Sequence, residues 1–230
     1  MGEGEIRELL SKVLKRIDVS KRQRKRIFEV ANWALRKLRK GFSEVEGVEV
    51  TLGGSIAKDT FLKTTQDIDI FVRFPKQMKD FMEIFKEKCE DVFPRARLIR
   101  GSRDYFRVRK GDYVIEIIPT LQIEKPEEAE NTMDLSIFHI AYVKNIFSKK
   151  PWLKDEVKLF KAFLQAINCY GAETYKHGFS GYASELLVIN FGSFLNTLKQ
   201  LSQLKPKIFV DPGKHYRNFE EAKACLSEAK

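Results

Sequence analysis

Apolar residues recur every three or four positions along the first forty residues, which is the spacing of one face of a helix. They predict two helices, over residues 5–17 and 21–40. Ser20 stands where it can cap the second helix, and Gly41 stands where that helix can end. The chain is therefore expected to begin with two amphipathic helices.

The pattern then changes to alternation, which is typical of strands. Val48, Val50 and Leu52 alternate toward Gly53, and a mostly apolar run continues to Phe74 after a short helix expected over residues 56–62. A helix is predicted over residues 78–92, followed by strands near residues 96–100, 104–109 and 112–118. This order predicts a mixed sheet with helices on one side.

The second half of the chain is predicted to be mainly helical. An acidic, irregular hinge is expected over residues 121–133, and helices are expected over residues 134–148, 152–169 and 180–201. Lys205 and Pro206 interrupt the pattern, and a short strand at 208–210 and a last helix over 217–229 are expected beyond them. The fold class is therefore α+β, with a sheet-containing part followed by a helical one.

Two aspartates stand in the otherwise apolar strand before Phe74. Asp67 and Asp69 are two residues apart, so both project from one face while Ile68 and Ile70 turn to the other. Two carboxylates held close together repel each other, and a divalent cation that prefers oxygen ligands, typically Mg²⁺, relieves that repulsion. The alternative is an ion pair with a nearby Arg or Lys, and the spacing alone favours this alternative.

A glycine-rich turn a dozen residues earlier changes that balance. Gly53, Gly54 and Ser55 let backbone amides approach a phosphate closely, and the start of the helix expected after them offers unpaired N–H groups. A phosphate-binding turn and a pair of metal-binding acids would then lie in one turn-helix-strand unit.

A third acid, Glu116, interrupts the β-branched run from Tyr113 to Pro119. An unpaired charge is costly to bury in such a strand, so Glu116 needs a cation. If this strand lies beside the one that carries Asp67 and Asp69, three carboxylates form a site for two metal ions, which is the requirement of nucleotidyl transfer. The alternative is a strand-edge glutamate paired with Arg107 or Arg109.

The sequence G-S, about ten residues, D-x-D-x-F and a later acid resembles the signature of the polymerase-β-like nucleotidyltransferase superfamily. A longer similarity, to the archaeal-type (class I) CCA-adding enzymes, covers nearly the whole chain. Its motifs are GGSIAKDTFLKTTQDIDIF, VIEIIP, MDLSIFH, EVKLFKAFLQAINCYGAE, GFSGYASELLVINFGSFL and FVDPGKHYRN. The resemblance implies a nucleotidyltransferase head over residues 1–130, a helical neck over 131–205 and the start of a body domain over 206–230.

The resemblance also implies roles for individual residues. Asp67, Asp69 and Glu116 would be catalytic and would bind two Mg²⁺ ions, with Glu116 at a position where the family usually has Asp. The residues implied to bind the nucleotide are Gly54, Ser55, Lys58, His139, Lys161, Tyr170 and Arg217. Lys58 stands where the family has an Arg, and it lacks the guanidinium group that can bind a phosphate through two N–H groups. Leu135 stands where the family has a second Arg.

Each of these nucleotide-binding positions also has an ordinary structural interpretation. Without the resemblance, Lys58 and Lys161 are typical of helix-surface lysines, and Tyr170 is typical of a core aromatic residue. His139 on an amphipathic helix is typical of a structural histidine, and Arg217 near a helix start has many other uses.

The charge of the chain indicates a polyanionic partner. Lys and Arg number 42 against 32 Asp and Glu, which gives a net charge of +10, and a dozen of the basic residues fall between Lys12 and Lys40. This clustering predicts a basic surface that faces RNA or a partner. Three widely spaced cysteines, Cys89, Cys169 and Cys225, fit neither a disulfide nor a zinc pattern, and no membrane span or signal peptide is predicted, so a cytoplasmic location is expected.

The acids predict nucleotidyl transfer, and the resemblance implies a template-independent enzyme that adds CMP and AMP from CTP and ATP to the 3′ end of tRNA. Two alternatives stay open: another polymerase-β-like transferase, of poly(A)-like or toxin type, and a non-catalytic tRNA-binding subunit. The class I enzymes continue for about as long again, with body and tail domains. An excised piece, a minimal enzyme and one half of a split enzyme with a second polypeptide are therefore all consistent with the sequence.

Overall fold

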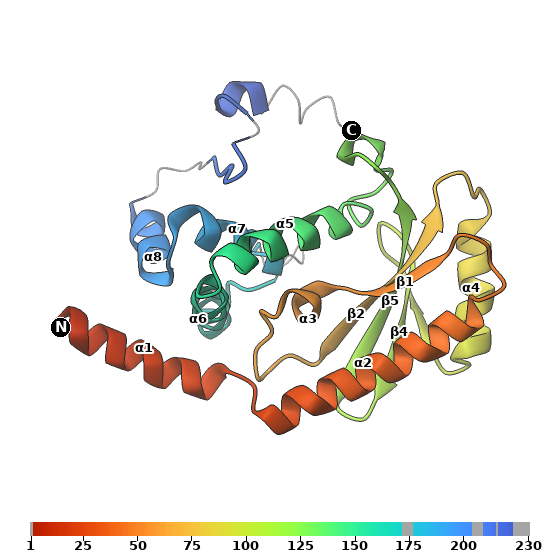
Figure 1. The fold of residues 1–230 in the computed structure, drawn as a ribbon, viewed down its shortest axis with the longest axis horizontal. Coiled ribbons are helices and arrows are strands. Elements are labelled where there is room, and N and C mark those ends of the chain that lie inside the picture. Colours follow the sequence, from red (N-terminus) through yellow and green to blue (C-terminus); the bar gives the residue numbers. More distant parts are fainter. Residues whose placement is uncertain (1, 172–176, 204–208, 215, 223–230) are drawn as a thin grey trace. The chain divides into compact units, whose positions relative to one another are not determined.

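The computed structural model describes residues 2–171, 177–203, 209–214 and 216–222 (Figure 1). The chain forms two compact units: one comprises Lys15–Asn145, and the other comprises Met1–Leu14 together with Ile146–Lys230. The first unit holds the whole sheet, and the second holds most of the C-terminal helices. Each unit is described separately below.

The first unit is built on a five-stranded mixed sheet, and a mixed sheet was predicted (Figure 1). Its strand order is β1-β2-β5-β4-β3. Strands β2 and β5 are parallel, and the other neighbouring pairs are antiparallel. The strands are β1 (Glu49–Leu52), β2 (Asp67–Pro75), β3 (Arg97–Ile99), β4 (Tyr105–Lys110) and β5 (Tyr113–Gln122). Strand β5 thus extends to Gln122, into the start of the stretch expected to be irregular, and the 3₁₀ turn Pro126–Glu128 follows it.

Helices α2 (Lys21–Gly41) and α4 (Phe81–Val92) pack against one face of this sheet. Their buried residues Leu38 and Phe85 belong to the same core as Ile68 of β2 and Ile117 of β5, and all four are fully buried. The predicted cap of α2 is confirmed: the Ser20 hydroxyl accepts a hydrogen bond from the Gln23 amide, within a complete capping box. The apolar face of α2 thus fixes the side of the sheet that is closed to solvent.

The opposite face of β2 and β5 carries the acids. Because side chains alternate along a strand, burying Ile68 and Ile70 turns Asp67 and Asp69 to the other side. Burying Ile115 and Ile117 does the same for Glu116. We call the side of the sheet that bears Asp67, Asp69 and Glu116 the acidic face.

The turn before the acidic strand differs from the expectation. The helix predicted over residues 56–62 is instead the single turn α3 (Gly54–Lys58). It ends at Asp59, whose φ of 60° is left-handed and therefore breaks the helical hydrogen-bond pattern. Helix α4 likewise starts at Phe81 rather than at Met78.

The remaining helices are α1 (Glu3–Ile17), α5 (Ser136–Lys149), α6 (Leu153–Ala166), α7 (Gly181–Phe191) and α8 (Phe194–Ser202). The prediction of one helix over residues 180–201 is wrong, because Gly192, with a φ of 81°, ends α7 in the left-handed conformation. Ser193 then caps α8 by accepting a hydrogen bond from the Asn196 amide. The α7–α8 break is further held by the Phe194 amide, which donates to the Glu156 carboxylate at 2.7 Å.

The end of the chain is described only in part. Residues 209 and 210 form no strand, whereas a short strand was expected at 208–210, and 208 lies outside the described residues. The helix expected from residue 217 begins at 219 and is described as far as 222. Lys205, Pro206 and Cys225 also fall outside the described residues. Cys89 and Cys169 are free thiols, as expected.

Candidate active site

The register of the two parallel strands brings the predicted acids to adjacent positions. Asp69 of β2 is paired with Glu116 of β5, and Asp67 is paired with Val114. Neighbouring strands are about 4.8 Å apart, so Asp69 and Glu116 project side by side from the acidic face. No ion pair is formed by Asp67 or Asp69 in the described part of the chain.

The crowding of these carboxylates changes the acidity of Asp69. Burial raises the pKa of Asp69 to about 7, with repulsion from Glu116 and then Asp67 adding to the effect, while Lys58 opposes it. The repulsion agrees with the strand register, which places all three acids on the same face of the sheet. A cation placed among them would remove the cause of the repulsion.

The glycine-rich turn packs directly on this site. The Gly53 amide donates to the Asp69 carbonyl oxygen at 2.7 Å, and Gly54 adopts a left-handed φ of 58°. A Cβ atom on Gly54 would lie 1.6 Å from Asp69 Oδ2, so a side chain at this position would displace the carboxylate. Ser55 follows in α3, and Lys58 at its end is 7% exposed.

Glu116 has a second neighbour, Arg107 of β4, with which it is also in register. Arg107 Nε donates to Glu116 Oε1 at 2.7 Å, and Arg107 NH2 lies 2.6 Å from the same oxygen. The hydrogen bond to Glu116 raises the pKa of Arg107. Glu116 therefore combines both interpretations of the sequence: it shares a face with the aspartates, and it is the partner of Arg107, not of Arg109.

The acidic face offers the hard oxygen donors that a divalent cation needs. Within the described residues, no three Asp, Glu, His or Cys side chains are grouped closely enough to hold a metal ion. The Arg107 guanidinium holds the Glu116 oxygen that would complete such a group. The donor set and the repulsion on Asp69 fit a divalent cation, provided that Glu116 turns away from Arg107.

The predicted nucleotide-binding residues divide between the two units. Gly54, Ser55 and Lys58 lie beside the acids, and His139 lies half-buried on α5 in the same unit. Lys161, Tyr170 and Arg217 belong to the other unit. Arg217 is exposed, and its backbone amide donates to the Glu221 carboxylate at 2.6 Å.

Lys161 is not a surface lysine. It is 2% exposed, and its Nζ lies 2.8 Å from Oε1 of Glu185, which is fully buried on α7. Gly181, at the start of the same helix, faces both predicted residues: its Cβ position lies 3.0 Å from the Tyr170 hydroxyl and 3.9 Å from Lys161 Nζ. The structure therefore brings Lys161 and Tyr170 together beside a glycine.

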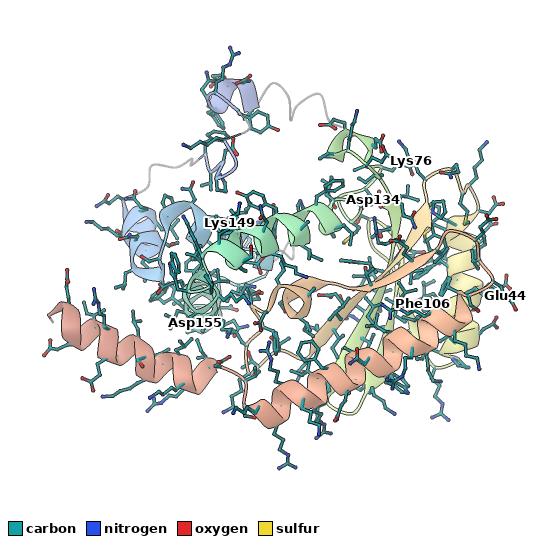
Figure 2. All side chains as sticks on the ribbon, viewed as in Figure 1. Glu44, Lys76, Phe106, Asp134, Lys149 and Asp155 are labelled. Atoms are coloured by element: carbon teal, nitrogen blue, oxygen red, sulfur yellow. The ribbon has the colours of Figure 1, made fainter. Side chains whose placement is uncertain are left out.

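Two buried acids with structural roles were missed by the sequence analysis. Glu185 is the only charged residue in the run from Tyr182 to Phe191, and this isolation was a signal that it needed a buried partner. Asp134, labelled in Figure 2, pairs with Arg103 and accepts hydrogen bonds from the Leu121 and Asn131 amides at 2.7 and 3.0 Å. No local pattern identified their ion-pair partners, Lys161 and Arg103, because these are distant in sequence.

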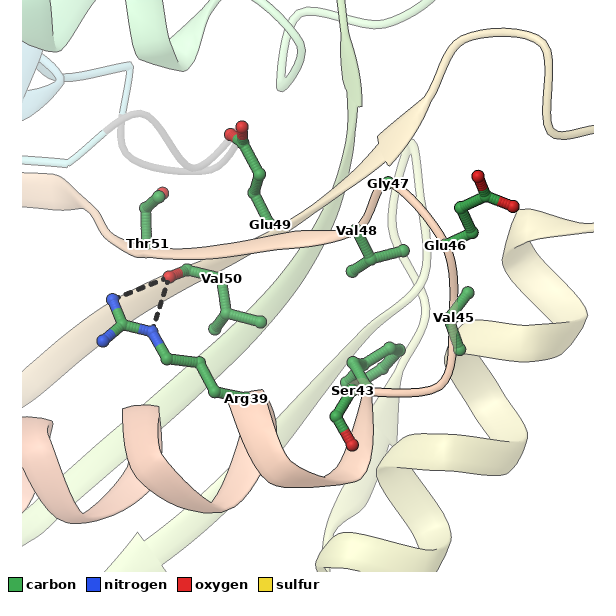
Figure 3. A pocket seen from close by; sticks show the side chains of 10 residues that line it. Arg39, Ser43, Val45, Glu46, Gly47, Val48, Glu49, Val50 and Thr51 are labelled. Carbon is green, nitrogen blue, oxygen red and sulfur yellow. Dashed lines mark hydrogen bonds between the residues drawn. The ribbon is translucent and has the colours of Figure 1, made fainter.

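A pocket of about 580 Å³ lies elsewhere, between the end of α2 and strand β1 (Figure 3). Arg39 donates from Nε and NH2 to the Val50 carbonyl oxygen at 3.2 and 3.1 Å, which covers part of the outer edge of β1. None of the predicted site residues lines this pocket. The candidate chemistry therefore remains with the acidic face.

Comparison with known proteins identifies both parts of the chain. Residues 35–139 match the family described as "Nucleotidyltransferase domain", and residues 155–227 match "tRNA nucleotidyltransferase, second domain". The CCA-adding enzyme of Nanoarchaeum equitans is 45% identical over 177 residues, which is 76% of this chain and 44% of that protein. The chain combines a nucleotidyltransferase domain with the second domain of tRNA nucleotidyltransferases, and it is similar to CCA-adding enzymes over most of its length.

Other CCA-adding enzymes match more of the chain. The Pyrococcus abyssi enzyme is 36% identical over 214 residues, which cover 88% of this chain and 46% of that protein. The Sulfurisphaera tokodaii enzyme is also 36% identical over 214 residues, covering 90% of this chain and 49% of that protein. The chain spans about half the length of the curated relatives that it matches.

Solved structures support the fold independently of this sequence similarity. A structure of the Cid1 poly(U) polymerase with Mg 3′-dATP superposes with a TM-score of 0.62 at 17% identity, covering 99% of this chain and 73% of that chain. The nucleotidyltransferase fold predicted from the sequence is thus confirmed. No helix in the described ranges is both long enough and apolar enough to span a membrane.

Proposed function

We propose that this chain is a template-independent RNA nucleotidyltransferase that adds CMP and AMP, from CTP and ATP, to the 3′ end of tRNA. The observation that carries this proposal is the placement of Asp67, Asp69 and Glu116 on one face, beside the Gly54–Ser55 turn, in a relative of the CCA-adding enzymes. The whole activity, including its tRNA substrate and its nucleotides, is proposed.

The three acids are proposed to bind two Mg²⁺ ions, with Asp67 and Asp69 as the constant ligands. When bound, such ions lower the pKa of a hydroxyl nucleophile and neutralise the charge on the transferring phosphate. Asp69 must be ionised for this role, and an opposite charge nearby favours its ionised form. Glu116 must exchange its Arg107 partner for an ion.

The remaining predicted residues are proposed to hold the nucleotide. Gly54 keeps the turn close to Asp69, and Ser55 and Lys58 offer a hydroxyl and a positive charge to phosphate oxygens beside the acids. His139, Lys161, Tyr170 and Arg217 are proposed as further contacts to the triphosphate, ribose and base. In this reaction the RNA 3′ oxygen bonds to the α-phosphorus, the bond to the β-phosphate breaks, and pyrophosphate leaves.

The direct test is incorporation of labelled CTP and ATP into tRNA that lacks its 3′ CCA end. Asp67→Ala and Asp69→Ala are expected to abolish incorporation, whereas Asp91→Ala, an exposed aspartate at the end of α4, is expected to retain it. Absence of label transfer with Mg²⁺ or Mn²⁺, both by the chain alone and with co-purifying proteins, would contradict the proposal. Transfer of a long tail of one nucleotide would instead indicate a poly(A)-like transferase.

The assay should be run with the chain alone and with proteins that co-purify with it from its native source. A second polypeptide is proposed as a source of further tRNA contacts. Restoration of activity by a co-purifying protein would identify that partner. Binding of tRNA without turnover under both conditions would favour a non-catalytic subunit, and a cytoplasmic location remains a prediction.

A further inference from the structure

A row of charged side chains crosses the sheet from the acids to its far edge. Asp69 of β2 is paired with Glu116 of β5, Glu116 with Arg107 of β4, and Arg107 with Arg97 of β3. Residues paired in this way project from the same face of a sheet. The charge therefore changes from negative over β2 and β5 to positive over β4 and β3.

A third arginine extends the positive part of this face. Arg109 is two residues beyond Arg107 on β4, so its side chain also projects from the acidic face. The intervening Val108 is buried in the core on the other side. Arg97, Arg107 and Arg109 are all exposed, and neither Arg97 nor Arg109 forms an ion pair within the described ranges. We call these three residues the arginine row.

The topology separates the arginine row from the predicted phosphate-binding turn. The Gly54–Ser55 turn packs on Asp69 from the β1 side of the acids, whereas the row lies over β4 and β3 on the other side. The row covers one strand spacing, about 4.8 Å, between β4 and β3, and its far end lies two spacings from β5. If the turn holds the triphosphate, the row lies where the second substrate, the RNA strand, must approach.

An aromatic ring lies beside the row. The Arg107 guanidinium carbon is 5.6 Å from the centre of the half-buried Tyr105 ring. Grooves that bind single-stranded nucleic acid combine positive charge along the backbone with aromatic rings that stack on bases. The row and Tyr105 have both features.

We propose that Arg97, Arg107 and Arg109 bind backbone phosphates of the RNA strand whose 3′ end lies at the acids. When Glu116 binds a divalent cation, Arg107 exchanges the Glu116 carboxylate for an RNA phosphate. Divalent cation and RNA therefore bind cooperatively, because each removes the partner that the other must displace. This inference rests on the proposed function, since it assigns a path to the same substrate.

The basic surface of α2 is the natural control. Lys21, Arg22 and Arg36 are exposed on the helix that covers the opposite, core-facing side of the sheet. They carry the same total charge as the arginine row. A purely long-range attraction would depend on net charge and treat the two sets alike.

The test is fluorescence anisotropy of the full chain with a single-stranded RNA oligonucleotide that has a free 3′ hydroxyl, without CTP or ATP. The R97Q/R107Q/R109Q variant is compared with K21Q/R22Q/R36Q over a range of salt concentrations. We expect the row variant to lose at least tenfold in affinity. The slope of log affinity against log salt concentration should be smaller in magnitude by about 2, because each of the three phosphate contacts contributes ~0.7. The α2 variant should lose less than about threefold in affinity, with a smaller change in slope. Equal losses, or a larger loss for the α2 variant, would overturn the proposal.

Two further measurements keep the test independent of folding and of catalysis. The R97Q/R109Q variant leaves the Arg107–Glu116 pair intact and should still reduce the slope by about 1.4. Mg²⁺ should strengthen RNA binding by the wild type more than by R107Q, and equal Mg²⁺ effects would contradict the exchange. Asp67→Ala retains the whole row, so it should bind RNA as the wild type does. If the wild-type chain fails to extend tRNA but shows these binding differences, only the proposed function is overturned.

Discussion

Asp69 and Glu116 lie opposite each other on the parallel strands β2 and β5, and the charge of Glu116 helps to raise the pKa of Asp69 to about 7. Burial is the larger cause, and Asp67 adds further repulsion. A site without a cation is therefore electrostatically unfavourable when all three acids are ionised. This relationship makes the stability of the first unit depend on pH and on divalent cations.

Asp69 should make the metal-free protein less stable as pH rises. A carboxyl with a pKa of about 7 when folded and about 3.9 when unfolded holds its proton more tightly in the folded state. Its contribution to the free energy of unfolding is therefore largest below about pH 4, and this contribution is lost as pH rises through about 7. Urea unfolding in EDTA should show that the free energy of unfolding of the wild type decreases with pH. The decrease should be smaller for Asp69→Asn, and for Asp91→Asn it should equal that of the wild type.

Divalent cations should reverse that loss above pH 7. Mg²⁺ should raise the melting temperature of the wild type more at about pH 8 than at about pH 5, because the ligand must be deprotonated. Asp69→Asn should abolish most of this increase. A Mg²⁺ effect that is equal at both pH values, or that survives in Asp69→Asn, would show that the cation binds elsewhere.

Gly54→Ala should reduce nucleotide transfer more than it reduces stability. Its Cβ would lie 1.6 Å from Asp69 Oδ2, and displacing a catalytic group by about 1 Å costs on the order of 100-fold in rate. Gly192→Ala is the matched control, because its φ of 81° is also left-handed but its Cβ would meet nothing within 4 Å. Similar losses of activity in the two variants would assign the effect to backbone strain alone.

Asp134→Asn should strongly destabilise the first unit. The Asp134 side chain is fully buried and holds Arg103 and two backbone amides, and breaking a buried ion pair from one side costs about 3–5 kcal/mol. Asp104→Asn removes pairs to Lys86 and Arg100 nearer the surface, where solvent screens the charges, and should cost clearly less. Urea unfolding measures both, and equal values would contradict the role given to Asp134.

Glu185→Gln should destabilise the second unit in the same way. It leaves Lys161, 2% exposed, without its carboxylate partner at 2.8 Å, with an expected cost of about 3–5 kcal/mol. If Lys161 also contacts the triphosphate, CTP should recover part of the lost melting temperature. Glu156→Gln, which replaces the acceptor of the Phe194 amide, should show less recovery with CTP.

The sequence predicted the parts of this fold that depend on local periodicity. Alternation placed Asp67 and Asp69 on one face of β2, and Ser20 was identified as the cap of α2. It could not choose the face of Glu116, because that depends on the register of β5 against β2, which pairs residues 47 positions apart. The break at Gly192 was missed although Gly192 and Ser193 are residue types that commonly end and cap helices.

The same limit applies to the partners of charged residues. An isolated acid in an apolar run indicated that Glu116 needed a cation, and the structure supplies Arg107 as one such partner. The pairing of Lys161 with Glu185 and of Arg103 with Asp134 joins residues 24 and 31 positions apart. Composition and spacing show that such charges need partners but not which residues provide them.

Anomalous diffraction from crystals grown with Mn²⁺ and a non-hydrolysable CTP analogue tests the central claim most directly. The account predicts Mn²⁺ peaks bonded to Asp67 and Asp69, with Glu116 turned from Arg107 toward the metal. Mn²⁺ bound away from β2, or metal bound at the aspartates with Glu116 still paired to Arg107, would contradict the proposed three-carboxylate centre.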